Sequence, residues 1–162
     1  MENVNPIEHN DIFDLAYRFV TETSENIFLT GNAGTGKTTF LKYLKENCSK
    51  NIIVAAPTGV AAINAGGVTL HSLFQLPFDP FLPTAANKRE LLGKLKYNTR
   101  RQDILRKMEL LVIDEISMVR CDTMDAIDTI LRSVRRKHET PFGGVQLLCI
   151  GDLYQLPPVA RR

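Results

Sequence analysis

The stretch Gly31–Thr38, GNAGTGKT, constrains the fold of this chain more than any other feature. It matches the pattern G-x-x-x-x-G-K-[ST], follows the short apolar run Asn26–Thr30, and leads into a helical pattern over Lys37–Cys48. Such a loop lets successive backbone N–H groups point at phosphate oxygens, and the following helix adds the positive end of its dipole. A chance glycine-rich turn is the alternative, and it is disfavoured because the motif and its context agree.

The loop predicts a phosphate-binding site for a magnesium nucleotide. We expect Lys37 to bridge the β- and γ-phosphates and the Thr38 hydroxyl to bind Mg²⁺. The predicted nucleotide-binding residues are Gly31, Asn32, Ala33, Gly34, Thr35, Gly36, Lys37, Thr38 and Thr39.

Two adjacent acids end the apolar run 109–114. In P-loop enzymes an acid at a strand tip holds Mg²⁺, which is the role expected of Asp114. The acid beside it can orient and deprotonate an attacking water, which is the role expected of Glu115. Alone, a strand that ends in acids is weak evidence, and a helix-capping pair is the alternative. Together with the P-loop it predicts a magnesium and hydrolysis site.

Apolar runs alternate with helical patterns along the chain, which predicts an α/β fold. Each run is nearly continuous in apolar residues, as expected for a mainly parallel sheet covered by helices on both faces. The length of 162 residues suits one domain. The patterns predict strands at 26–30, 51–56, 109–114 and 145–150, a helix capped by Asn10, a helix over 37–48, a helical basic segment over 88–107, and a helix from a cap at Asp122 to about 137.

The formal net charge of +2 does not indicate a nucleic-acid partner, but its distribution is uneven. Basic residues are concentrated in 88–107 and again in 132–137. A solvated helix face and a phosphate-contacting surface both remain open for these segments. The three cysteines lack metal-ligand spacing, the N-terminus is polar and no run could span a membrane, which favours a reducing cytoplasm. We expect a bacterial cytoplasm or nucleoid in preference to a eukaryotic nucleus.

Four blocks together resemble the amino-terminal motor domain of PIF-type, RecD-like DNA helicases of superfamily one. They are GNAGTGKTTFLK, APTGVAAINAGGVTLHSLF, VIDEISMV and GDLYQLPPV, which correspond to motifs I, Ia, II and III of that family. The resemblance covers about residues 26–159 and implies a RecA-like P-loop NTPase fold. The second and fourth blocks are much more specific than the P-loop alone.

This resemblance implies a function and further site residues. Family members hydrolyse ATP with Mg²⁺ and move 5′-to-3′ along single-stranded DNA, unwinding forked duplex DNA during replication, repair or recombination. It implies that Lys37, Glu115 and Gln155 are catalytic, with Gln155 coupling the γ-phosphate to the DNA groove, and that the chain acts as a monomer. The candidate DNA contacts are Pro57, Thr58, Gly59, Gly67, Thr69 and His71.

Several assignments stay open at this stage. Phe74 could stack on a base or belong to the core, and His71 could contact DNA or be a structural histidine. Many relatives have an adenine-reading glutamine before the P-loop, whereas this chain has none before Gln75, and Asn10 is a substitute candidate. Another P-loop ATPase and a non-catalytic nucleotide- or DNA-binding module are the alternative functions.

The chain ends shortly after the fourth block. We therefore expect residues 1–162 to be a single ATP-binding domain, helicase domain 1A, without the second motor domain. That second domain supplies the arginine that stabilises the transferring phosphate, so we expect weak nucleotide binding and no unwinding by this chain alone.

Overall fold

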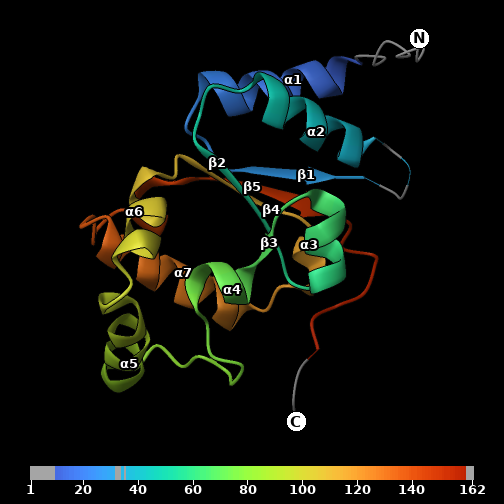
Figure 1. Ribbon diagram of the computed structural model, residues 1–162. Helices are drawn as coiled ribbons and strands as arrows, with labels where there is room; N and C mark the ends of the chain where they lie inside the picture. The colour runs from blue at the N-terminus through green and yellow to red at the C-terminus, as the bar shows by residue number, and fades with distance from the viewer. Residues whose placement is uncertain (1–9, 32–33, 35, 160–162) are drawn as a thin grey trace.

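A parallel sheet runs through the centre of the molecule (Figure 1). The computed structural model describes residues 10–31, 34 and 36–159, and within these the sheet has five strands in the order β1-β5-β4-β2-β3. All four strand pairs are parallel. The strands are β1 Ile27–Thr30, β2 Ile52–Ala56, β3 Val68–Thr69, β4 Leu110–Ile113 and β5 Gln146–Gly151.

Helices cover both faces of this sheet, as predicted. In the view of Figure 1, α1 and α2 lie above the sheet and α4 to α7 lie below it. The helices are α1 Asp11–Glu22, α2 Lys37–Asn47, α3 Gly59–Ala65, α4 Leu70–Phe74, α5 Ala85–Lys96, α6 Thr99–Lys107 and α7 Cys121–Val134, with 3-10 turns η1 Ile116–Met118 and η2 Pro141–Gly144. The predicted RecA-like α/β architecture is confirmed.

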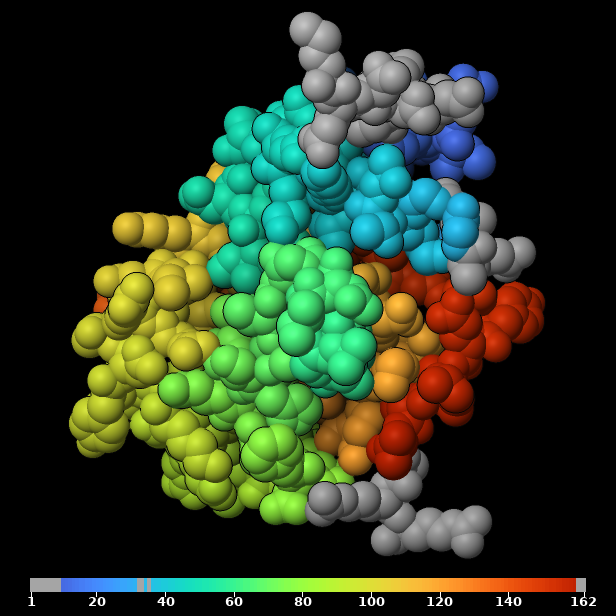
Figure 2. Space-filling view, turned by 45° about the vertical axis from the view of Figure 1, so that its right-hand side comes forward, coloured from blue at the N-terminus to red at the C-terminus, as the bar shows by residue number. Residues whose placement is uncertain are grey.

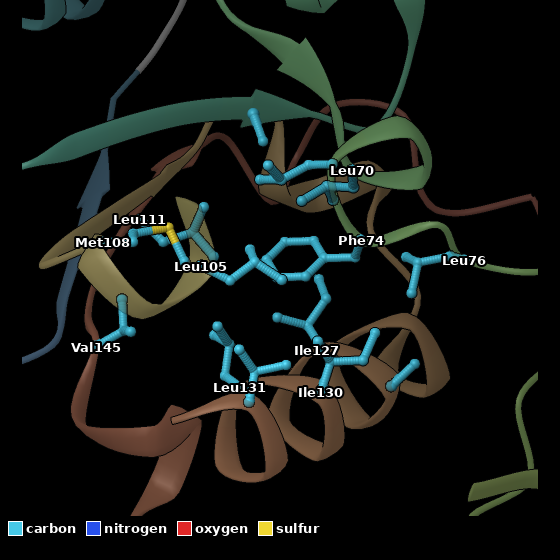
Figure 3. Packing of buried hydrophobic residues seen from close by; sticks show 14 of the residues in the cluster. Leu70, Phe74, Leu76, Leu105, Met108, Leu111, Ile127, Ile130, Leu131 and Val145 are labelled. Carbon is cyan, nitrogen blue, oxygen red and sulfur yellow. The ribbon is translucent and has the colours of Figure 1, made fainter. Parts of the chain in front are cut away.

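Two apolar cores, one on each face, hold the helices to the sheet. The smaller core joins α1 and α2 to the sheet through residues such as Val20, Leu44 and Val112. The larger core joins α4 to α7 to the other face, and Figure 3 shows the Phe74 ring near its centre, beside Ile127. Phe74 is fully buried, so the suggestion that it stacks on a base is wrong and the core alternative is correct. Its burial stabilises the fold by roughly 1.5–3 kcal/mol.

The two predicted helix caps had different outcomes. Asn10 caps α1, because its Oδ1 accepts a hydrogen bond from the Phe13 amide at 2.8 Å. Asp122 does not cap α7, since the helix begins at Cys121 with Arg120 in the cap position. The Asp122 carboxylate instead accepts from the Phe81 amide at 2.8 Å and from Arg120 Nε at 2.7 Å. The acid therefore ties the loop between α4 and α5, which contains Pro77, Pro80 and Pro83, to the start of α7.

The segment 57–74 after β2, for which the sequence patterns predicted no helix or strand, contains three short elements. It forms α3, the short strand β3 and α4, so the strand expected as the fourth along the chain is β5. At Gly67 an added Cβ would lie 2.3 Å from the Val54 carbonyl oxygen. The glycine is thus required by a close approach of two backbones.

The basic segment 88–107 forms two helices instead of one. The break falls at Tyr97 and Asn98, where the Asn98 Oδ1 accepts from the Arg101 amide at 3.0 Å and caps α6. A side-chain oxygen that satisfies one of the free amides of a helix start favours a new helix at this point.

Four arginines of the basic segments bind backbone carbonyls, a role that neither sequence alternative included, and all but Arg132 reach a carbonyl of another helix. Arg101 donates to the carbonyls of Ser72 and Leu73 at the end of α4. Arg106 donates to the Val134 carbonyl at 3.2 Å. Arg135 donates to four carbonyls, those of Leu105, Arg106, Met108 and Gly143. These side chains hold α4, α6 and α7 together.

The three cysteines are free thiols. Among the described residues there is no helix with the length and apolar content needed to cross a membrane.

Candidate nucleotide-binding site

The carboxyl ends of the parallel strands meet at one edge of the sheet and form a cleft of about 750 Å³. Open α/β sheets bind ligands at this edge. The structure brings the predicted residues Lys37, Thr38, Asp114, Glu115 and Gln155 together in the lining of this cleft. Most of the remaining lining residues come from α2, α3 and the segment after β5, and include Leu41, Val60, Ala61, Asn64, Tyr154 and Pro157.

Two glycines shape the backbone of the described part of the P-loop. Gly34 and Gly36 have φ values of 81° and 84°, and an added Cβ at either position would meet nothing within 4 Å. Glycine is therefore needed here for its left-handed conformation, since there is ample space. Lys37 Nζ donates to the Gly31 carbonyl at 2.5 Å, which joins the two ends of the loop. Asn32, Ala33 and Thr35 lie outside the described residues.

The acid pair follows β4, where a tight turn fixes the backbone. The Asp114 amide donates to the Ala55 carbonyl of β2 at 2.9 Å, and Asp114 Oδ1 accepts from the Glu115 amide at 2.9 Å. Glu115 has a φ of 52°, a conformation unusual for a residue with a side chain and one that occurs preferentially at functional sites. Burial raises the pKa of Asp114, opposed by the Glu115 amide and by the charge of Lys37. The Lys37 ammonium thus acts on the Asp114 carboxylate.

Gln155 is held at the cleft by a turn that begins with Asp152. The buried Asp152 accepts from the Tyr154 amide through Oδ1 at 2.9 Å, and its carbonyl accepts from the Gln155 amide at 3.1 Å. Asp152 lies near the P-loop, since it lines the same hollow as Gly36 and Lys37. The sequence motifs did not point to Asp152, although an aspartate whose side chain accepts from the backbone amide two residues later is a known turn-forming arrangement.

The candidate DNA contacts divide into two groups by position. In the first, Thr69 pairs with Ala56 in the parallel register, so the ends of β2 and β3 lie side by side. Pro57, Thr58 and Gly59 follow directly from β2, and Thr58 also lines the cleft. The Thr58 and Thr69 hydroxyls accept from the Ala61 and Ser72 amides and so cap α3 and α4. These caps leave the hydroxyl protons able to donate to phosphates.

The second group is farther from the cleft. Gly67 is explained by its packing against Val54. His71, on α4, stacks on the exposed Phe78 ring with a centroid separation of 5.4 Å and an interplanar angle of 13°. Both residues therefore have a structural account, and their contact with DNA stays a prediction. Asn10, the candidate for adenine recognition, uses its side-chain oxygen to cap α1.

The residues of the cleft fit a magnesium nucleotide. Mg²⁺ keeps several waters and is usually held by one or two carboxylates together with substrate phosphates. The cleft offers the Asp114 carboxylate and the Thr38 hydroxyl. Among the described residues there is no group of three or more His, Cys, Asp or Glu side chains that could hold a metal on its own. The oxygens of Asp114 and Thr38 suit an ion that arrives with phosphate oxygens.

The arrangement of this edge is that of a RecA-like P-loop nucleotide-binding domain. Comparison with known proteins shows which family of P-loop proteins the chain belongs to. The family model described as PIF1-like helicase matches residues 6–162, and the chain belongs to this family of superfamily one helicases.

Individual relatives agree with the family assignment. The ATP-dependent DNA helicase PIF1 of Candida albicans is 38% identical over 165 residues, covering 99% of this chain and 17% of its own length. A structure of two coordinating Pif1 helicases, described for DNA unwinding at forked dsDNA, has 50% identity and a TM-score of 0.87, covering 96% of this chain and 36% of that one. Bacteroides Pif1 in complex with ADP-AlF3 and ssDNA has 52% identity and a TM-score of 0.84, covering 94% and 34%. The chain thus spans about a sixth to a third of these relatives.

Proposed function

We propose that this chain is the ATP-binding domain 1A of an ATP-dependent 5′-to-3′ DNA helicase. The observation that supports this most strongly is the meeting of Lys37, Thr38, Asp114, Glu115 and Gln155 in one cleft at the carboxyl edge of the sheet. Bacteroides Pif1 was crystallised with ADP-AlF3 and ssDNA, which supports a nucleotide and single-stranded DNA as the ligands of this chain.

The roles of the cleft residues follow from their positions and charges. The P-loop amides and Lys37 neutralise phosphate charge, while Thr38 and Asp114 supply the oxygens for Mg²⁺. Burial raises the pKa of Asp114, and a neighbouring cation favours its ionised form, which Mg²⁺ binding needs. Glu115 accepts the proton of the attacking water, and its left-handed backbone fixes where its side chain begins.

Gln155 is proposed to report the state of the γ-phosphate to the DNA groove. Its amide is bonded to the Asp152 carbonyl, so a displacement of Gln155 moves the turn that follows β5. The groove itself is proposed to use Pro57, Thr58, Gly59 and Thr69, since β2 and β3 end beside the cleft. The proposed partners are single-stranded and forked duplex DNA, and the chain is expected to be a monomer.

The chain alone is expected to bind nucleotide weakly and to turn it over very slowly. An arginine supplied across a cleft contributes about 10³–10⁵ to hydrolysis in P-loop enzymes. We expect this arginine to come from outside the 162 residues.

A fluorescent ATP analogue titrated into the chain, with and without Mg²⁺, tests the proposal. We expect Mg²⁺-dependent binding that Lys37→Ala abolishes and Glu115→Gln retains. Lys42→Ala is the matched control, because Lys42 is an exposed lysine of the same helix that is not part of the cleft lining. Equal affinity in the Lys37 and Lys42 variants would refute the proposed site.

The catalytic roles are tested in a longer protein that contains this chain and the second motor domain. There Glu115→Gln should abolish ATP turnover, and Gln155→Ala should leave turnover that DNA no longer stimulates. Full DNA stimulation in the Gln155 variant would contradict the coupling role.

A further inference from the structure

The corner between α5 and α6 has an excess of positive charge that the fold does not neutralise. The acids of this region are already engaged: Glu90 with Lys94 at 3.2 Å, Asp103 with Arg106 at 3.1 Å, and Glu109 with the Asn51 amide at 2.8 Å. Five further cations are exposed and, among the described residues, have no acidic partner. They are Lys88, Arg89, Lys96, Arg100 and Lys107.

Helical spacing gathers four of these cations into two rows. Residues seven positions apart lie on the same face of a helix. Arg89 and Lys96 share one exposed face of α5 in this way, and Arg100 and Lys107 share one face of α6. Each row therefore presents two cations to solvent.

An exposed aromatic residue lies at the junction of the two helices that carry the rows. Tyr97 is 86% exposed and directly follows Lys96 at the end of α5. Between Arg89 and Lys96 on the helix face lies Gly93, where an added Cβ would meet nothing within 4 Å. The surface beside the ring is thus open on the α5 side, and a flat group can approach it.

The corner also adjoins α4, the short helix that carries one of the predicted DNA contacts. Arg101 in the first turn of α6 donates to the carbonyls of Ser72 and Leu73, which holds this end of α6 against α4. His71 lies on the same short helix α4. Figure 2 shows α5 and α6 on one flank of the molecule and the segment after β5 on the opposite flank. The corner is therefore separate from the nucleotide cleft, while it borders the region of His71.

We propose that Lys96, Tyr97 and Arg100, with Arg89 and Lys107 beside them, form a second binding surface for single-stranded nucleic acid. The cations neutralise successive phosphates, and an unpaired base stacks on the Tyr97 ring. Stacking selects a single strand over a duplex, whose bases are already stacked on one another. The assignment of this strand as DNA rests on the proposed function.

Fluorescence anisotropy of a labelled oligo(dT) bound to the chain at several salt concentrations tests the charged contacts. The test variant is Lys96→Gln/Arg100→Gln. The control is Arg18→Gln/Lys42→Gln, which removes the same charge from exposed positions on α1 and α2, across the sheet. Each lost phosphate contact makes the negative slope of log K against log salt shallower by about 0.7. We therefore expect the slope to become shallower by about 1.4 in the test variant only.

The aromatic contact is tested separately. Tyr97→Ala should weaken oligo(dT) binding about tenfold, the order expected for the loss of one stacked base, whereas Tyr97→Phe should retain the affinity. Polyglutamate should compete poorly, and a blunt duplex should be insensitive to Tyr97→Ala. Each of three results would overturn the proposal. They are equal salt slopes in the two double variants, unchanged oligo(dT) affinity in Tyr97→Ala, and competition by polyglutamate as strong as that by oligo(dT) itself.

These results can be separated from those of the nucleotide cleft. The corner variants should bind the fluorescent ATP analogue as the unchanged chain does. If the chain binds the analogue normally and the corner variants bind oligo(dT) as tightly as the unchanged chain, only the proposed corner surface is refuted. Failure of the unchanged chain to bind the analogue would refute the proposed function, whatever the corner does.

Discussion

Gly151 is predicted to be essential for a close contact between β5 and the turn that follows the acid pair. An added Cβ at Gly151 would lie 2.9 Å from Ile116 Cγ2, 3.1 Å from the Ile116 amide nitrogen and 3.4 Å from the Ser117 amide nitrogen. A Cβ contact shorter than 3.0 Å requires the neighbouring atoms to move away. Because a β-branched side chain is stiff at χ1, the movement must include the backbone of η1, which directly follows Glu115. Gly151→Ala should therefore disturb both the stability and the acid pair.

The expected magnitude follows from this overpacking. One methyl forced into a packed interior costs about 1–3 kcal/mol in free energy of unfolding. Removing Ile116 Cγ2 with Ile116→Ala relieves the shortest contact only. The double variant should thus be more stable than the sum of the two single changes predicts, by about 0.5 kcal/mol or more.

Urea unfolding followed by circular dichroism measures these differences, and Gly93→Ala is the control. Gly93 lies in α5 with nothing within 4 Å of an added Cβ, so the same methyl should stabilise the chain by about 0.5–1 kcal/mol. Opposite signs for the two alanine variants are the expected result. If Gly151→Ala were as stable as the unchanged chain, or if Gly93→Ala lost as much stability, the steric argument would be refuted.

Two further predictions concern titratable groups. Burial opposes ionisation of Asp122, but the Phe81 amide and the Arg120 guanidinium outweigh it and lower the pKa of this carboxyl. Its ionised form therefore stabilises the fold above the ordinary pKa of aspartate, and this contribution disappears as the pH falls through the lowered pKa. Asp122→Asn should cost about 1–3 kcal/mol at neutral pH in urea unfolding, with a smaller cost in acid, and a cost independent of pH would contradict the assignment. Burial also raises the pKa of the Cys149 thiol to about 11, so iodoacetamide at mildly alkaline pH should label the exposed Cys121 first, as peptide mass spectrometry can show.

The local patterns predicted the elements around the site well. The strands that precede the P-loop and the acid pair are short apolar runs with polar ends, and their signals need no tertiary information. For β1 and β4 the observed strands lie within the predicted runs. Because parallel strands share a carboxyl edge, the gathering of Lys37, Asp114 and Gln155 also followed from the sequence alone.

Features that depend on distant partners could not be predicted in this way. β3 has two residues, and it exists because Val68 and Thr69 pair with the end of β2. The Asp122 carboxylate is positioned by Phe81, which is 41 residues away along the chain. Gly34 and Gly151 are the same letter in the sequence, yet Gly34 is required for its φ and Gly151 for its neighbours.

The basic segments show most clearly why counting charges is not sufficient. An arginine has several donors in a planar group, and the last carbonyls of a helix lack partners within the helix. Arg135 donates to carbonyls at the end of α6, and Arg101 does so at the end of α4, so these cations hold helices together. A nucleic-acid surface can be formed only by the cations that remain exposed. The predicted nucleic-acid surface is therefore the corner that includes Lys96 and Arg100, in place of the whole of the basic segments.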